Sequence, residues 1–214
     1  MVEPSGPAKR LVLGSGSPRR QALLRRLGVP FDVRVADVDE RALWTGDVVD
    51  SARRSASAKH RALLGTCAPG ECLLTADTLV AVGGEVLGKP TDLDDARQML
   101  RTCSARPLQI VTALCFGALG APPLEHAVET TVHLAELSDG WIEDYLRTGV
   151  ALDKAGALEL QGAASGFVER LEGCWSNVVG LPICAVAELV DLDPRGSHRV
   201  ERCRGAACGA GDGQ

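Results

Sequence analysis

The feature that most constrains the fold is a short apolar run that passes through glycines directly into a helix. Residues 10–15 (RLVLGS) are typical of a buried strand, and the segment that follows has leucines at helical spacing. Ser17 suits the N-cap, Pro18 the first helical position and Gly28 the position just beyond the helix end. The chain is therefore predicted to open with a strand, a turn and a helix.

Strands and helices also intermix along the rest of the chain. Further strands are predicted over residues 31–36, 73–82, 109–117, 128–137 and 166–171, and helices over residues 48–64, 91–100, 138–148 and 181–190. Because they do not alternate strictly, the pattern favours an α/β or α+β domain around a mixed sheet. Residues 193–214 are rich in glycine, arginine and small side chains, so a disordered tail is expected there.

Length and charge exclude several classes of protein. With 214 residues, the chain is long enough for one large domain or two small lobes that share a cleft. Its net charge of -5 argues against duplex nucleic acid as a partner, because such partners select a basic surface. The uncharged residues 107–124 contain prolines and glycines, so we interpret them as a strand entering a turn rather than a membrane span.

Cysteine usage and the first residues of the chain indicate a cytoplasmic protein. The 8 cysteines form no CxxC pair, which favours reduced thiols over disulfides or a zinc site. Residues 1–17 lack the apolar run of a signal peptide. The chain is therefore expected in the cytoplasm, without nucleic-acid or membrane partners.

Two glycine-containing segments are candidates for phosphate binding. Residues 14–19 (GSGSPR) lead from a strand to a helix N-terminus, where backbone amides and the helix dipole can hold an anion. Arg19 stands where a dinucleotide-binding loop needs glycine, which leaves a phosphate cradle and a plain exposed helix start as alternatives. Residues 83–90 fail as a P-loop at Pro90, so Lys89 is either a phosphate contact or an ordinary turn lysine.

Acidic residues supply the candidates for metal binding and proton transfer. Asp77 interrupts the apolar residues 73–82, where a buried charge must be compensated and therefore suggests a function. Together with Asp39 and Glu40, it could supply oxygen ligands for Mg²⁺ or Mn²⁺. The alternative for the acidic pair is a solvated turn after a strand.

Seven segments of the chain occur in the order found in one protein family. They are SGSPRRQALLRRLG (residues 15–28), the pair Asp39-Glu40, Lys59, TADT (75–78), GKP (88–90), LDKAGALELQG (152–162) and NVVGLP (177–182). The chain thereby resembles the Maf family of nucleoside triphosphate pyrophosphatases over residues 10–192. The resemblance implies an α/β fold with an elongated mixed sheet, flanking helices and two lobes around a deep cleft, similar to the inosine triphosphate pyrophosphatases.

The resemblance also implies an activity, a cofactor and a set of site residues. The implied reaction is metal-dependent hydrolysis of dTTP and UTP to the monophosphate and pyrophosphate, and a role in clearing non-standard nucleotides is compatible with it. Asp77 is the implied proton acceptor, and the implied ligands of Mg²⁺ or Mn²⁺ are Asp39, Glu40 and Asp77. The implied substrate-binding residues are Ser15, Ser17, Arg19, Lys59, Thr78, Lys89, Asp153, Lys154 and Gln161.

Substrate choice within the family is implied by Arg19, Thr78 and above all Gln161. The branch that acts on dTTP and UTP has glutamine at the position of Gln161, whereas the branch that prefers 7-methyl-GTP has glutamate. A carboxamide offers both a donor and an acceptor, which can match the O4 and N3–H groups of uracil or thymine. The chain departs from the family at Leu158, at Ser104-Ala105 and at Val150-Ala151, and these departures weaken the substrate assignment more than the activity.

A regulatory role is the alternative function. The family is associated with septum formation and cell-division arrest, so the competing hypothesis is a nucleotide-binding regulatory protein without significant hydrolysis. The charged residues favour an enzyme, because a sensor has no need of a base beside a metal ion. A homodimer is also compatible with the resemblance.

Overall fold

One mixed sheet organises the protein, and the computed structural model describes it over residues 10–190. The sheet has 7 strands in the order β2-β1-β3-β5-β6-β7, with β4 paired to the end of β3. The strands are β1 (Arg10–Leu13), β2 (Phe31–Val33), β3 (Glu71–Val82), β4 (Glu85–Leu87), β5 (Pro107–Ala118), β6 (Leu124–Leu134) and β7 (Val168–Glu172). Strand β1 runs parallel to β2 and β3, and the other pairs are antiparallel, which confirms the predicted mixed α/β sheet.

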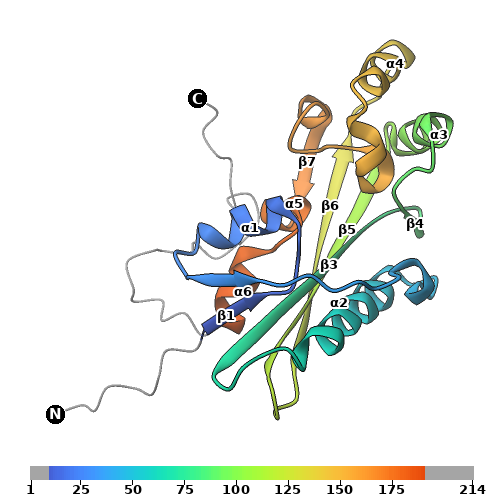
Figure 1. Ribbon diagram of the computed structural model, residues 1–214. Coiled ribbons are helices and arrows are strands. Elements are labelled where there is room, and N and C mark those ends of the chain that lie inside the picture. The colour runs from blue at the N-terminus through green and yellow to red at the C-terminus, as the bar shows by residue number, and fades with distance from the viewer. Residues whose placement is uncertain (1–9, 191–214) are drawn as a thin grey trace.

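Helices flank the sheet in three groups (Figure 1). They are α1 (Pro18–Arg25), α2 (Val48–Leu64), α3 (Leu93–Cys103), α4 (Asp139–Arg147), α5 (Trp175–Val179) and α6 (Ile183–Leu189), with 3₁₀ turns η1 (Arg41–Leu43), η2 (Val150–Asp153), η3 (Ala155–Ala157) and η4 (Ser165–Phe167). Helices α1 and α6 lie beside β1, α3 and α4 lie at the other end of the molecule, and α2 lies along β3. Among residues 10–190, no helix is both long and apolar enough to cross a membrane.

Two of the four apolar cores in the described residues define lobes that share the long strands β3, β5 and β6, and the other two lie against α2. The first lobe (β1, β2, α1 and α6) buries Leu13, Leu24 and Val186, and the second lobe (α3, α4 and η2 to η4) buries Leu100, Ile142 and Leu108 of β5. Helix α5 joins them, because Val178 packs on the second core and Val179 on the first. The two lobes predicted for the chain are therefore confirmed.

The outer edge of β3 is interrupted between the lobes. Residues 71–74 of β3 pair with β1, and Val80 to Val82 pair with β4, whereas the opposite edge pairs with β5 from Cys72 to Val82. In the described part of the chain, residues 75–79 thus have no strand on their outer edge. Side chains from both faces of β3 can reach the opening that this interval leaves.

Several predicted boundaries differ from the structure for local reasons. The predicted capping box of Thr91 and Asp94 is wrong, because Asp92 is the N-cap of α3 and its carboxylate accepts from the Asp95 amide. The strand predicted over residues 31–36 is shorter, ending at Val33 where the pairing with β1 ends. Strand β4 and helix α5 were not predicted, since three and five residues are too few to show a periodicity. The predicted tail lies outside the described residues.

Close packing at the end of β1 gives a test of the fold. A Cβ atom on Gly14 would lie 2.5 Å from Thr75 Cγ2 and 2.9 Å from Leu63 Cδ1, between β3 and α2. We expect Gly14→Ala to lower the free energy of unfolding by about 1–3 kcal/mol through overpacking. Gly140→Ala in α4 is the control, because nothing lies within 4 Å of its new methyl group. Denaturant unfolding that gave equal stabilities for the two variants would contradict this packing.

Candidate functional site

A cavity of about 660 Å³ lies against the interrupted edge of β3 and is lined by both lobes. Its polar lining comes from Ser17, Arg19, Arg20, Glu40, Lys59, Asp77, Thr78, Lys89, Asp153, Lys154, Glu159 and Gln161. Its apolar lining includes Val80, Leu108, Ile110, Leu158 and Leu160. The structure therefore brings together every predicted site residue except Ser15 and Asp39.

A buried ion pair forms the floor of the cavity. The Lys59 ammonium of α2 lies 2.7 Å from Asp77 Oδ1 on β3 and 2.6 Å from Glu40 Oε1. Asp77 is only 2% exposed, and burial raises the pKa of its carboxyl above the ordinary value, although the Lys59 charge opposes that rise. Asp77 Oδ2 has no hydrogen-bond partner in the described structure, so it retains its capacity to accept a proton or a ligand.

Of the three predicted metal ligands, the structure brings only two, Glu40 and Asp77, close together. Glu40 and Asp77 contact the same ammonium, so their carboxylates lie side by side. The Asp39 carboxylate instead accepts from the Ala42 amide at 3.3 Å and does not line the cavity. Among residues 10–190, no three His, Cys, Asp or Glu side chains are grouped to hold a metal ion. The unpartnered, buried Asp77 Oδ2 and its acidic neighbour suit a hard divalent cation, with Asp39 outside that pair.

Arg20 is the important residue that sequence reasoning did not separate from Arg19. Its guanidinium donates to the Gly180 carbonyl at 2.8 Å, the Ala76 carbonyl at 2.8 Å and Thr78 Oγ1 at 2.9 Å. Burial lowers its pKa, and attraction to Asp77 opposes that effect. Because the Ala76 carbonyl lies in the interrupted interval of β3, Arg20 replaces a missing strand there and fixes the strand against the loop after α5.

Two residues predicted to bind substrate, Thr78 and Ser15, already form hydrogen bonds around Arg20. Thr78 Oγ1 lies 2.9 Å from Thr112 Oγ1 on β5 and 3.3 Å from the Gly180 carbonyl, in addition to its bond with Arg20. Ser15 Oγ accepts from the Ser17 amide at 3.3 Å and from Arg20 at 3.4 Å, and Ser15 does not line the cavity. The hydroxyl groups of Thr78 and Ser15 therefore help to hold Arg20 in place.

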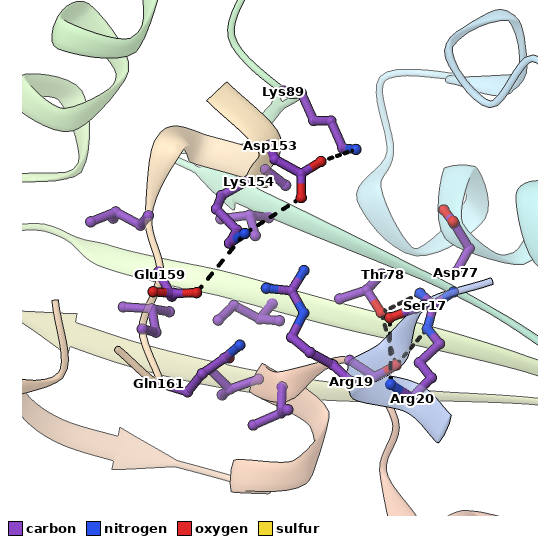
Figure 2. Close-up of a pocket in the computed structure, with 18 of the residues that line it drawn as sticks. Ser17, Arg19, Arg20, Asp77, Thr78, Lys89, Asp153, Lys154, Glu159 and Gln161 are labelled. Carbon is purple, nitrogen blue, oxygen red and sulfur yellow. Dashed lines mark hydrogen bonds and ion pairs between the residues drawn. The ribbon is translucent and has the colours of Figure 1, made fainter. Parts of the chain in front are cut away.

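Alternating charges follow the wall that belongs to the second lobe (Figure 2). The Lys89 ammonium lies 2.8 Å from Asp153 Oδ1, and this contact lowers the pKa of the Asp153 carboxyl. Lys154 lies 3.5 Å from Asp153 Oδ2 and 3.9 Å from Glu159 Oε1. This order places cations and anions in turn along one side of the cavity.

Arg19 and Gln161 both line the cavity, and their polar groups are available. Figure 2 shows Arg19 extending from α1 toward the wall that carries Lys154, Glu159 and Gln161. Within the described residues, neither the Arg19 nor the Gln161 side chain makes a hydrogen bond or ion pair. Ser17, which also lines the cavity, caps α1 by accepting from the Arg20 amide, so a helix N-terminus opens into the same space.

Arg19 and Arg20 are expected to respond in opposite ways to truncation. Arg20→Ala leaves the buried Ala76 and Gly180 carbonyls without their donor, so we expect the free energy of unfolding to fall by roughly 3 kcal/mol or more. Arg19→Ala removes no such contact and should change the free energy of unfolding by less than about 0.5 kcal/mol. Denaturant melts of both variants check this, and similar losses for the two would show that Arg20 has no special structural role.

The family model and similar curated proteins agree on one family. The family model "Maf-like protein" matches residues 10–192. The chain is 48% identical over 187 residues to a dTTP/UTP pyrophosphatase from Anaeromyxobacter dehalogenans, covering 86% of this chain and 93% of that protein. It is 41% identical over 179 residues to a protein of the same name from a Geobacter species, covering 83% and 92%.

Some solved structures resemble this chain over part of its length, and their sequence identity to it is much lower. A nucleoside-triphosphatase / dITP/XTP pyrophosphatase from Mycobacterium abscessus matches with a TM-score of 0.38 and 16% identity, over 60% of this chain and 75% of that one. A HAM1 protein from Coxiella burnetii matches with a TM-score of 0.40 and 18% identity, over 71% and 88%. Since the family model covers all of residues 10–190 and relatives above 40% identity span most of the chain, the chain belongs to the Maf family.

Proposed function

We propose that the protein hydrolyses nucleoside triphosphates between the α- and β-phosphates, with dTTP and UTP as preferred substrates. The observation that carries the proposal is the buried Asp77 carboxylate, which Lys59 holds by one oxygen at the floor of a cavity lined with cations. Relatives at 41–48% identity that are named dTTP/UTP pyrophosphatases support the reaction and the choice of base.

Cationic side chains provide a binding site for the triphosphate. Arg19, Lys59 and Lys89 line the cavity, and the N-terminus of α1 opens into it at Ser17. Lys59 and Lys89 contact carboxylates, so a phosphate oxygen would share or replace an existing ion pair. Arg19 has no such partner among the described residues, which leaves its planar donors for the substrate.

Asp77 is proposed as the proton acceptor for the attacking water. Oδ1 is fixed by Lys59, whereas Oδ2 has no hydrogen-bond partner, so one of its lone pairs can accept a proton from a water molecule while the other faces the cation. In the metal-free protein, burial raises the pKa of this carboxyl above that of an ordinary aspartate. Lys59 in turn lies where it can bind a phosphate oxygen close to that water.

A divalent cation is part of the proposal. Glu40 and Asp77 would hold Mg²⁺ or Mn²⁺, and the ion would withdraw charge from the phosphates. Asp39 was expected to complete this set, but its contact with the Ala42 amide places it outside the cavity. Glu40 and Asp77 are therefore the ligands that we propose from this chain.

The base would lie toward the wall that carries Gln161. The Gln161 amide has both a donor and an acceptor, and neither is engaged within the described part of the chain. The competing hypothesis of a regulatory nucleotide-binding protein has the same cavity and differs in the absence of turnover. A homodimer, a cytoplasmic location and a role in clearing non-standard nucleotides remain hypotheses on which this geometry does not depend.

Product identification tests the proposed reaction. The purified protein is incubated with a panel of nucleoside triphosphates with Mg²⁺, with Mn²⁺ or with a chelator, and the products are separated by chromatography. We expect dTMP or UMP with pyrophosphate, and loss of activity with the chelator. Diphosphate with orthophosphate would refute the proposed bond cleavage, and nucleotide binding without turnover would favour the regulatory hypothesis.

Asp77→Asn tests the role of the carboxylate. The change keeps the shape but removes the charge and the basic oxygen, so we expect kcat for dTTP to fall by at least about a hundredfold while the protein stays folded. Asp32→Asn is the matched control, because Asp32 lies in an exposed ion pair on β2. A folded Asp77→Asn variant with near-parental single-turnover rates would remove Asp77 from the mechanism.

The titration of Asp77 in the metal-free protein tests the electrostatics of the same site. Because burial raises the pKa of this carboxyl in the absence of metal, its basic form is lost as the pH falls through a value above the ordinary aspartate pKa of about 3.9. We expect an NMR titration of the metal-free protein, with Asp77→Asn to assign the signal, to give a midpoint above that value. A midpoint at or below it would contradict the raised pKa.

A further inference from the structure

Glu159 occupies the part of the cavity where a base would be read, and neither the charge pattern nor the family motif identified it. It lies two residues before Gln161, and its side chain is 28% exposed while Leu158 and Leu160 beside it are buried. Figure 2 shows its carboxylate beside Lys154, on the wall that also carries Gln161 and toward which Arg19 extends. A carboxylate is thus located among groups that are donors or both donors and acceptors.

The local backbone holds this carboxylate in place. The Glu159 amide donates to Tyr145 Oη of α4 at 3.1 Å, and its carbonyl accepts from the Gly162 amide at 3.0 Å. A Cβ atom on Gly162 would lie 2.2 Å from Glu159 Oε2, so the carboxylate rests over a position where only glycine leaves room. The turn after Glu159 therefore limits where its side chain can go.

The hydrogen-bonding capacity of Glu159 is unused. Its nearest cation is Lys154, at 3.9 Å from Oε1, which is beyond the range of a direct N–H···O hydrogen bond. No other side chain in the described structure bonds its carboxylate. Oε2 lies against Gly162, whereas Oε1 lies on the side of Lys154, and Glu159 lines the cavity together with Arg19, Lys154 and Gln161.

We propose that Glu159 determines base specificity by accepting the N3–H group of uracil or thymine, an inference that rests on the proposed function. The edge of these bases presents an acceptor, a donor and an acceptor in order: O4, N3–H and O2. Glu159 supplies the central acceptor, and Gln161 with Arg19 or Lys154 supplies the flanking donors. Cytosine carries a lone pair at N3, so the carboxylate disfavours cytosine as well as attracting uracil.

Base-modified substrates test this assignment. We compare kcat/KM for UTP, CTP and N3-methyl-UTP in the parent, Glu159→Gln and Glu159→Ala, with Glu169→Gln on an exposed part of β7 as the control. In both Glu159 variants, kcat/KM should fall by about tenfold or more for UTP and change little for N3-methyl-UTP. Glu159→Gln should also raise kcat/KM for CTP, because its amide can donate to cytosine N3. If the ratio of kcat/KM for UTP to that for CTP stayed at the parental value in both variants, the proposal would be overturned.

Two further measurements separate the possible failures. Gly162→Ala keeps the Glu159 charge but displaces its carboxylate, so it should also reduce the ratio of kcat/KM for UTP to that for CTP. If Glu159 only balanced the charge of Lys154, this ratio would stay unchanged. If the parent hydrolyses none of the triphosphates, the proposed function fails. Calorimetric binding of UMP and CMP then still tests Glu159, and an equal preference in parent and Glu159→Gln would overturn its role.

Discussion

The buried ion pair between Lys59 and Asp77 is the interaction on which the site depends. An isolated carboxylate that is 2% exposed would cost several kcal/mol, and the ammonium at 2.7 Å offsets this cost across the interface between α2 and β3. The same ammonium contacts Glu40, so it also ties the segment before η1 to the sheet. One oxygen of Asp77 is thereby fixed while the other stays available for chemistry.

The interrupted edge of β3 explains how such a site fits into a sheet. Strands β1 and β4 cover the two ends of that edge, and Arg20 donates to the buried Ala76 carbonyl between them. Alternation along β3 then sends Asp77 toward α2 and Thr78 toward α1, although both reach the same cavity. The interval is open for a ligand because no strand covers it in the described structure, and the Arg20 side chain binds its Ala76 carbonyl.

Much of the fold and part of the site could be predicted from the sequence. The run from residue 73 to 82 is apolar enough to mark a buried strand, and Asp77 is conspicuous within it. Arg19 and Arg20 are identical neighbours, however, so only tertiary contacts separate the buried one from the available one. For the same reason the pair of Asp39 and Glu40 could not be divided, since the turn into η1 directs only Glu40 to Lys59.

A crystal structure of the protein with a nonhydrolysable α,β-imido analogue of dTTP tests the central claim most directly. We expect the α-phosphorus beside Asp77, the triphosphate against Arg19, Lys59 and Lys89, and the thymine N3–H within hydrogen-bond distance of Glu159. An analogue bound with its base toward α2, or with its α-phosphorus remote from Asp77, would contradict the site as we describe it.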